Sequence, residues 1–103
     1  MNELTAYIPT HPGSVIKEEL EYRGISQKRF AEAIRMPYSM LNEILNGKRP
    51  VSTEFALSIE VALGISAELL GRMQTRYNFT MARKDQKTIA RLDAIRNICA
   101  SLL

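Results

Sequence analysis

The sequence predicts an all-α fold, in which five helices form one compact domain and a further helix follows at the C-terminal end. Apolar residues recur at spacings of three and four along most of the chain, which is the period of an amphipathic helix. Capping residues and glycines divide this pattern into separate segments. With 103 residues, of which 46% are hydrophobic, the chain can bury one small core.

The first predicted helix follows residues 1–9, an N-terminal arm whose β-prone stretch TAYIP is an alternative edge strand. Pro12 suits the first turn of this helix, and either Thr10 or His11 can cap it. Gly24 can adopt the left-handed conformation that ends a helix. We therefore expect a helix from about Pro12 to just before Gly24.

Two short helices follow, over about 26–34 and about 37–46. Ser26 is a good N-cap for the first of them, and Pro37 suits the first turn of the second, which ends at Gly47. The apolar side chains of these two helices fall on one face of each and predict their buried sides: Phe30, Ala31 and Ile34, then Leu41, Ile44 and Leu45.

Ser52 caps the fourth predicted helix, which ends at Gly64, and Ser66 caps the fifth, AELLGRMQTRY. These five helices define a domain over residues 10–80. Residues 81–103 form a basic amphipathic helix with one apolar stripe. Such a stripe is typical of a core helix, and the alternatives are a dimer seam or a docking surface for a partner. The stripe contains Ile89, Leu92, Ile95, Cys99 and Leu102.

Positive charge is concentrated in two parts of a chain whose net charge is +3. Residues 23–49 contain more Lys and Arg than Glu, and residues from 72 onward are also mainly basic. Each cluster fits either a solvated surface or a surface for polyanions such as nucleic acid.

Several classes of protein are disfavoured by composition. Cys99 is the single cysteine and cannot form an internal disulfide, and the start of the chain has no signal-peptide pattern, so we expect a cytoplasmic protein. No apolar run approaches the roughly 20 residues of a membrane span. One histidine and one cysteine cannot form a zinc tetrad, and no phosphate loop or nucleophile–base pair is present. We therefore expect no enzyme, no cofactor and no metal, with His11 a helix-start residue.

The helices over 26–34 and 37–46, joined by a tight turn, predict a helix-turn-helix. The side of the second helix opposite its apolar face carries Tyr38, Ser39 and Asn42, where charged residues are usual on a solvated face. An asparagine amide can bond bidentately to adenine, and hydroxyl groups can donate or accept at base edges. This face therefore suits the major groove of DNA.

The stretch SQKRFAEAIRMPYSMLNEILNGKR resembles the Xre-type helix-turn-helix of phage repressors. Together with HPGSVIKEELEYRGISQ before it and ALGISAELLGRMQTRYNF after it, the chain resembles HigA-type antitoxins of bacterial toxin–antitoxin modules over residues 10 to about 80. The resemblance implies a phage-repressor-like domain that acts as a homodimeric repressor of a pseudo-palindromic operator. It also implies neutralisation of a RelE-like ribonuclease toxin and autoregulation of the shared operon. The alternatives are a stand-alone Xre-type regulator and a protein-binding module of the same fold.

The resemblance makes the helix over 37–46 the recognition helix and divides the site residues into two groups. The expected base contacts are Tyr38, Ser39 and Asn42, and the expected phosphate contacts are Gln27, Lys28, Arg35, Asn46, Lys48 and Arg49. Each of these residues, taken singly, also fits an ordinary surface position. Glu43 either accepts from a cytosine amino group or pairs with a basic neighbour.

Two positions depart from the family pattern. The turn usually has glycine where this chain has Arg35, and a left-handed conformation costs a non-glycine residue on the order of 1 kcal/mol. The alternative is an altered turn from which Arg35 reaches a phosphate. Pro37 stands where the family has a serine-like cap, and proline offers no side-chain acceptor.

Overall fold

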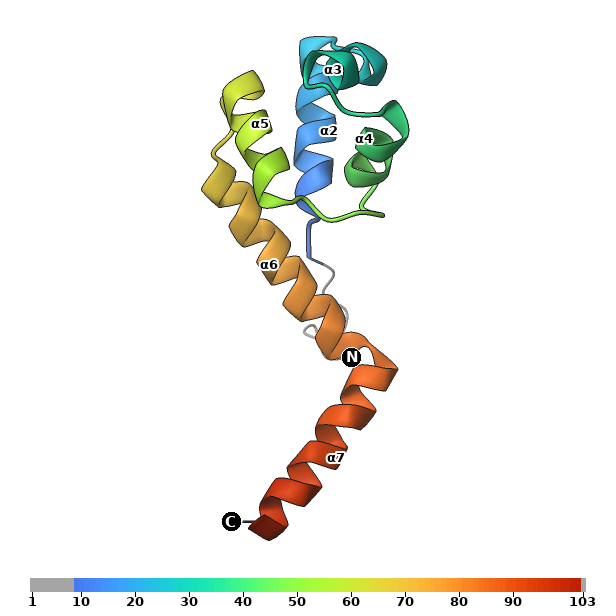
Figure 1. Cartoon of the computed structure of the whole chain (residues 1–103), viewed down its shortest axis with the longest axis vertical. Coiled ribbons are helices and arrows are strands. Elements are labelled where there is room, and N and C mark those ends of the chain that lie inside the picture. Colours follow the sequence, from blue (N-terminus) through green and yellow to red (C-terminus); the bar gives the residue numbers. More distant parts are fainter. Residues whose placement is uncertain (1–8, 103) are drawn as a thin grey trace. The chain divides into compact units, whose positions relative to one another are not determined.

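The computed structural model describes residues 9–102, in which six α-helices and no strand are found (Figure 1). This confirms the all-α prediction. The N-terminal arm predicted over 1–9 lies outside the described residues except for Pro9. Residues 10–75 form one compact unit, and the residues from 76 onward belong to a second unit, which is described by itself. The helices are α2 Pro12–Arg23, α3 Gln27–Ala33, α4 Tyr38–Leu45, α5 Thr53–Leu63, α6 Ala67–Lys84 and α7 Gln86–Leu102.

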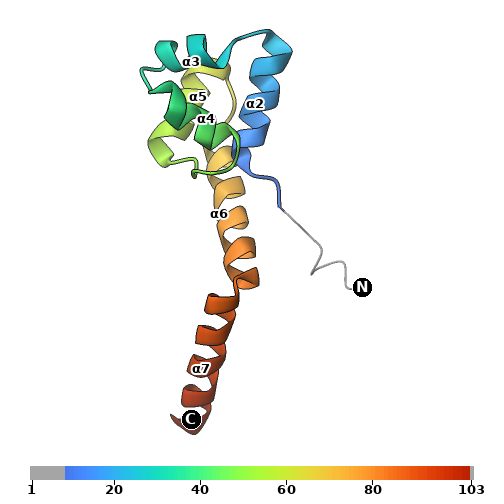
Figure 2. The same cartoon turned by 90° about the vertical axis from the view of Figure 1, so that its right-hand side faces the viewer.

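The core of the compact unit is made by the apolar faces of α2 to α5 and the first turn of α6. Helix α4 packs against both α2 and α3, as two perpendicular views show (Figures 1 and 2). Predicted inward residues of α3 and α4 are buried, and Ile34 is partly buried against them. The fully buried apolar side chains include Ile16, Leu20, Leu41, Leu45, Ile59 and Leu70.

The predicted caps are confirmed at the N-termini of four helices. His11, and not Thr10, caps α2, because its Nδ1 accepts from the backbone N–H of Gly13 at 2.9 Å. The hydroxyls of Ser26, Ser52 and Ser66 accept a backbone N–H from three residues ahead, each at 3.2 Å. These side chains satisfy donors that the first turn of a helix leaves unpaired.

Left-handed residues end or follow the helices where glycine was expected, with one exception. Gly24 and Gly64 end α2 and α5 at φ +68° and +75°, and Gly47 follows α4 at φ +74°. Arg35, in the turn between α3 and α4, has φ +58° and is the single positive-φ residue other than glycine among the described residues. The turn is therefore not altered to suit arginine, and Arg35 carries the backbone strain of this conformation.

The C-terminal helices differ from their predicted limits. Helix α6 continues to Lys84, past the predicted end near Tyr77, because no residue in between interrupts helical geometry. Helix α7 starts at Gln86, not at residue 81. The break is at Asp85, whose Oδ2 accepts from the backbone N–H and the hydroxyl of Thr88 at 3.0 and 2.9 Å. Asp85 is thus an N-cap that starts a new helix.

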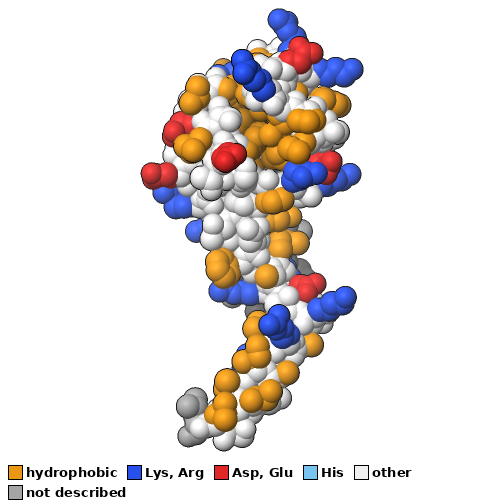
Figure 3. Space-filling model, in the orientation of Figure 1, with side chains coloured by type: hydrophobic (Ala, Val, Ile, Leu, Met, Phe, Trp, Pro, Cys, Tyr) orange, Lys and Arg blue, Asp and Glu red, His pale blue; other side chains and the backbone are white. Residues whose placement is uncertain are grey.

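No described residue of α7 is buried. Apolar side chains lie along the surface of this helix (Figure 3). Leu92 and Ile95 are 46% and 45% exposed, and Leu102 is 75% exposed. The prediction that this stripe belongs to the core of the chain is therefore wrong for the described residues, and the two interface alternatives remain.

Two side chains join segments that are distant in sequence. The guanidinium of Arg23 at the end of α2 donates to the Leu63 carbonyl oxygen at the end of α5, at 2.8 Å. Buried Gln74 of α6 accepts from the backbone N–H of Val51 at 2.8 Å. The second bond satisfies a buried donor in the loop that follows α4, so it fixes the path of that loop.

Candidate nucleic-acid interface

Helix α4 is held by its apolar side and presents a polar side to solvent. Leu41, Ile44 and Leu45 are at most 3% exposed. On the remaining surface, Tyr38 and Ser39 at the first turn are exposed, and Asn42 is half-buried one turn later. The structure therefore places the three predicted base-contacting residues together on the accessible part of one helix.

The HPG sequence at the start of α2 determines how closely α4 packs against α2. His11 is the N-cap, Pro12 occupies the first position of the helix, and buried Gly13 lies directly against the Ile44 carbonyl. A Cβ on Gly13 would lie 2.9 Å from the Ile44 carbonyl carbon and still closer to its oxygen. Only glycine allows α2 and α4 to approach this closely.

Three predicted DNA contacts are connected by hydrogen bonds. The Asn42 amide nitrogen Nδ2 donates to the side-chain oxygen Oε1 of Gln27, at the start of α3, at 3.1 Å. The amide nitrogen of Asn46 donates to the Asn42 backbone oxygen at 2.9 Å. The ammonium of Lys17 in α2 donates to Asn46 Oδ1 at 3.0 Å. These contacts link α2, α4 and α3 across the surface of the compact unit.

Lys17 was not among the sequence-predicted site residues. It lies 29 positions from Asn46, and its place in α2 resembles that of any solvated lysine. The contact between Lys17 and Asn46 can be expected only once α2 is known to pack against α4.

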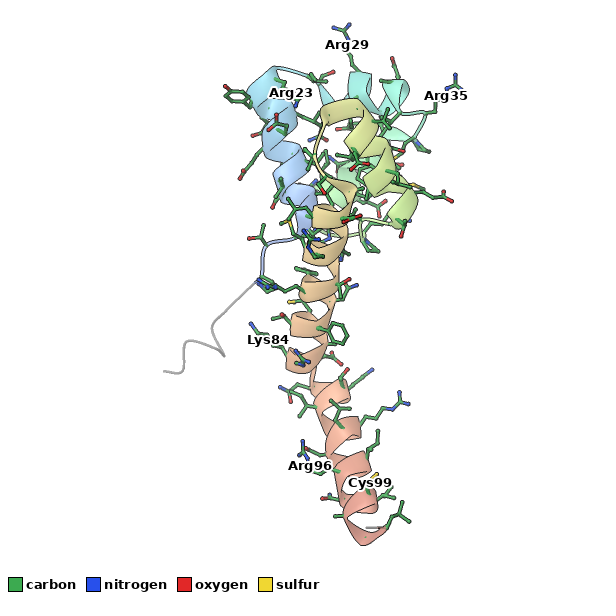
Figure 4. All side chains as sticks on the ribbon, turned by 90° about the vertical axis from the view of Figure 1, so that its left-hand side faces the viewer. Arg23, Arg29, Arg35, Lys84, Arg96 and Cys99 are labelled. Carbon is green, nitrogen blue, oxygen red and sulfur yellow. The ribbon has the colours of Figure 1, made fainter. Side chains whose placement is uncertain are left out.

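The predicted basic residues surround α4 without forming one cluster. The Lys28 ammonium lies 5.9 Å from the Tyr38 ring centroid, within cation–π range. Arg35 points away from the ribbon of the compact unit, as does Arg29, which is not one of the predicted contacts (Figure 4). Lys48 and Arg49 are exposed just beyond the C-terminal end of α4.

Glu43 is paired with a basic neighbour, which was the second of its two predicted roles. Arg49 Nη2 lies 3.4 Å from Glu43 Oε2, and both side chains are more than 40% exposed. An ion pair with that exposure contributes little to stability, so Arg49 can exchange Glu43 for a phosphate at small cost.

His11 is the titratable group with a shifted pKa in this region. Burial lowers its pKa below the ordinary value of 6.5, because desolvation penalises the imidazolium form. The neutral form also leaves Nδ1 able to accept from Gly13, as a cap requires. His11 therefore has a structural role at the start of α2, as the sequence predicted.

Within residues 9–102, no group of three or more His, Cys, Asp or Glu side chains could hold a metal ion. No helix in the same range has the length and hydropathy to cross a membrane.

The fold and this polar helix face define a helix-turn-helix protein of the kind that binds DNA. The chain belongs to the helix-turn-helix family, whose model matches residues 16–70. Virulence-associated protein I of Dichelobacter nodosus is 34% identical over 89 residues, which cover 85% of this chain and 80% of the relative.

Solved structures extend the similarity beyond sequence. An addiction module antidote protein of the HigA family from Coxiella burnetii is 28% identical, with a TM-score of 0.72 over 85% of this chain and 95% of that one. A Pseudomonas aeruginosa protein in complex with its operator DNA shares the fold, with 24% identity and a TM-score of 0.69 over 86% of this chain and 90% of that chain. The similarity to HigA-type antitoxins is thus confirmed at the level of fold and family.

Proposed function

We propose that this protein is a sequence-specific DNA-binding transcriptional repressor that reads bases with α4. The observation that carries the proposal is the division of α4 into a buried apolar side and an accessible face bearing Tyr38, Ser39 and Asn42. Side-chain amides and hydroxyls near a helix axis can match donor and acceptor patterns in the major groove. The operator-bound structure of a protein with the same fold supports this use of the fold.

The remaining site residues hold the DNA backbone. Positively charged and amide side chains around both ends of α4 suit phosphate oxygens, which accept hydrogen bonds and attract cations without reporting base identity. We assign this role to Gln27, Lys28, Arg35, Asn46, Lys48 and Arg49.

The repressor acts as a cytoplasmic homodimer on a pseudo-palindromic operator, with two copies of α4 about 34 Å apart. The exposed apolar stripe of α7 supplies a dimer or partner surface, because no residue of this amphipathic helix is buried by the rest of residues 9–102. This surface contains Ile89, Leu92, Ile95, Cys99 and Leu102.

The protein is also the antitoxin of a toxin–antitoxin pair and neutralises a RelE-like ribonuclease. Support comes from the HigA-family antidote, which matches 85% of this chain. Growth arrest on expressing the neighbouring gene, relieved by co-expressing this chain, would establish that pairing. Absence of arrest and of a complex would favour a stand-alone regulator.

DNA binding is tested by titrating the protein with its own promoter duplex and with a random duplex at two salt concentrations. Asn42→Ala is expected to cost about 1 to 3 kcal/mol and to relax preference at one base pair. Asn97→Ala, which removes an exposed asparagine of α7, is the matched control and should leave preference unchanged. Equal binding of both duplexes by the wild-type protein would contradict the proposal and favour a protein-binding module.

Phosphate contact is tested in the same titrations with Arg49→Ala. This variant should weaken binding to all sequences alike and reduce the slope of log K against log salt by about one. The control is Arg72→Ala, which removes the same charge from an exposed position in α6. An unchanged salt slope for Arg49→Ala would remove Arg49 from the interface.

A further inference from the structure

We propose that a cavity in the compact unit binds a small molecule that has one carboxylate group and an apolar body. The cavity has a volume of about 480 Å³ and lies among the end of α2, the turn that follows it, α3 and the end of α5. Pockets for small ligands usually enclose about 300 to 1,000 Å³, so this space suits one compact molecule. The site is separate from the proposed DNA interface, because none of the predicted base or phosphate contacts lines it.

The lining of the cavity is mostly apolar. Phe30 and Leu63 are buried core residues that line it, and Ile25 is partly buried against the same core. Two exposed alanines, Ala33 in α3 and Ala62 in α5, also line the space, and their short side chains leave it unfilled. The apolar body of a ligand placed here removes hydrocarbon surface from water, which favours binding.

Arg23 provides a fixed hydrogen-bond donor at this cavity. Its Nε donates to Glu19 at 2.7 Å and its Nη2 donates to the Leu63 carbonyl oxygen at 2.8 Å, so two bonds hold the plane of the guanidinium. A guanidinium has five N–H groups, and the other three have no acceptor among residues 9–102. Paired N–H groups in one plane match the two oxygens of a carboxylate.

Arg29 provides a second positive charge. Its exposed side chain lines the cavity and extends away from the ribbon of the compact unit (Figure 4). Within the described part of the chain, its guanidinium makes no hydrogen bond or ion pair, so it can rotate over a bound molecule. Glu19 offsets one of the two arginine charges, and a single carboxylate on the ligand balances the other.

These features together define the class of ligand. A neutral apolar molecule would leave the guanidinium N–H groups without an acceptor, and inorganic phosphate would leave the apolar lining in contact with water. An aromatic or branched monocarboxylate satisfies both parts of the site. Gln27 bonds to Asn42 of α4 at 3.1 Å and does not line the cavity, so a bound ligand does not occupy the surface that we assign to DNA.

The test uses the full chain without DNA, so its result does not depend on the proposed function. NMR spectroscopy follows the backbone amides of isotope-labelled protein during titration with phenylacetate, benzoate and isovalerate, each beside its neutral primary amide. At least one of these acids should shift the backbone amides of Gly24, Ala33 and Ala62 until they saturate. The matching neutral amide should bind about 10-fold more weakly, because it forms no charge-assisted hydrogen bond.

Two variants separate the apolar and the charged parts of the site. Ala62→Leu fills the cavity from an exposed position and should abolish the saturable shifts, whereas Ala90→Leu, exposed in α7, is the matched control. Arg29→Gln removes one charge without breaking a side-chain bond and should weaken binding of the acid about 10-fold. Its control is Arg72→Gln in α6. Thermal unfolding of each variant checks that the domain is folded.

The inference is overturned if none of the three acids gives saturable shifts at these amides. It is also overturned if a neutral amide binds as tightly as its acid, or if folded Ala62→Leu protein binds the acid as the wild type does. Shifts spread over all basic surfaces of the chain would have the same meaning, because they indicate nonspecific attraction of anions.

Discussion

Replacement of Gly13 by alanine is expected to destabilise the domain by about 2 kcal/mol, although alanine is the better helix former. Gly13 lies in the first turn of α2, and a Cβ there would overlap the Ile44 carbonyl of α4. The neighbouring atom belongs to backbone, so it cannot rotate away as a flexible side chain would. Either the start of α2 or the whole of α4 has to move.

The magnitude follows from two opposing effects. Forcing a methyl group into a closely packed contact costs about 1 to 3 kcal/mol, and the upper end applies where backbone must shift. The higher helix propensity of alanine relative to glycine offsets about 0.5 to 1 kcal/mol of this cost. The difference of about 2 kcal/mol corresponds to a decrease in Tm of roughly 10 °C for a domain of this size.

Chemical denaturation followed by circular dichroism measures this effect, with Gly71→Ala as the matched control. No heavy atom lies within 4 Å of a Cβ built on Gly71, so that change should stabilise α6 by about 0.5 to 1 kcal/mol. If α4 is the element that moves, the operator affinity of Gly13→Ala should decrease as well. A Gly13→Ala protein as stable as the wild type would refute the close approach of α2 and α4.

Three further predictions concern the turn, the loop after α4 and the start of α2. Arg35→Gly should raise the free energy of unfolding by about 0.5 to 1 kcal/mol, because glycine adopts φ +58° without strain. In the same variant, a reduced dependence of DNA binding on salt concentration would reveal that Arg35 contacts a phosphate. Unchanged or lower stability would contradict the left-handed turn. Gln74→Leu should lower the free energy of unfolding by about 1 to 3 kcal/mol, since it leaves the buried Val51 N–H without its acceptor. Urea denaturation measures this, and Gln86→Leu, at an exposed position of α7, is the comparison. If the two variants are equally stable, the bond to Val51 does not contribute to stability. The pKa of His11 is lowered in the folded state, so the unfolded chain binds a proton at a higher pH than the folded protein does. The free energy of unfolding should therefore have its full His11 contribution above about pH 6.5 and should decrease as the pH falls below that value. Denaturation at about pH 5 and about pH 8 should show this loss in the wild type and a smaller one in His11→Asn, which keeps a capping acceptor; equal losses would exclude His11 as the cause.

The parts of the fold that sequence predicted are those controlled by neighbouring residues. Ser26, Ser52 and Ser66 cap their helices through bonds to groups three residues ahead, and Gly24 and Gly64 end theirs by local backbone geometry. Such interactions can be predicted from a few consecutive letters. The burial of the apolar side of α4 followed from its spacing for the same reason.

The features that sequence did not predict depend on contacts between distant segments. Nothing in the letters around Gln74 indicates a bond to Val51, 23 positions away. The Lys17–Asn46 bond likewise exists only after α2 and α4 have packed. The start of α7 was predicted wrongly for another reason. Asp85 directly follows the last residue of α6, so the helical pattern continues through it and does not indicate that Asp85 caps a new helix.

The Gln27–Asn42 bond has a consequence for how proteins with this helix-turn-helix diverge. Under the proposed function, a duplicated gene needs a new operator so that the two circuits remain separate. If the amide at position 42 is replaced, the partner at position 27 faces a group it no longer fits, so the two codons are expected to change together. Divergence at these two positions would then proceed by paired substitutions, and the two positions would covary among descendants.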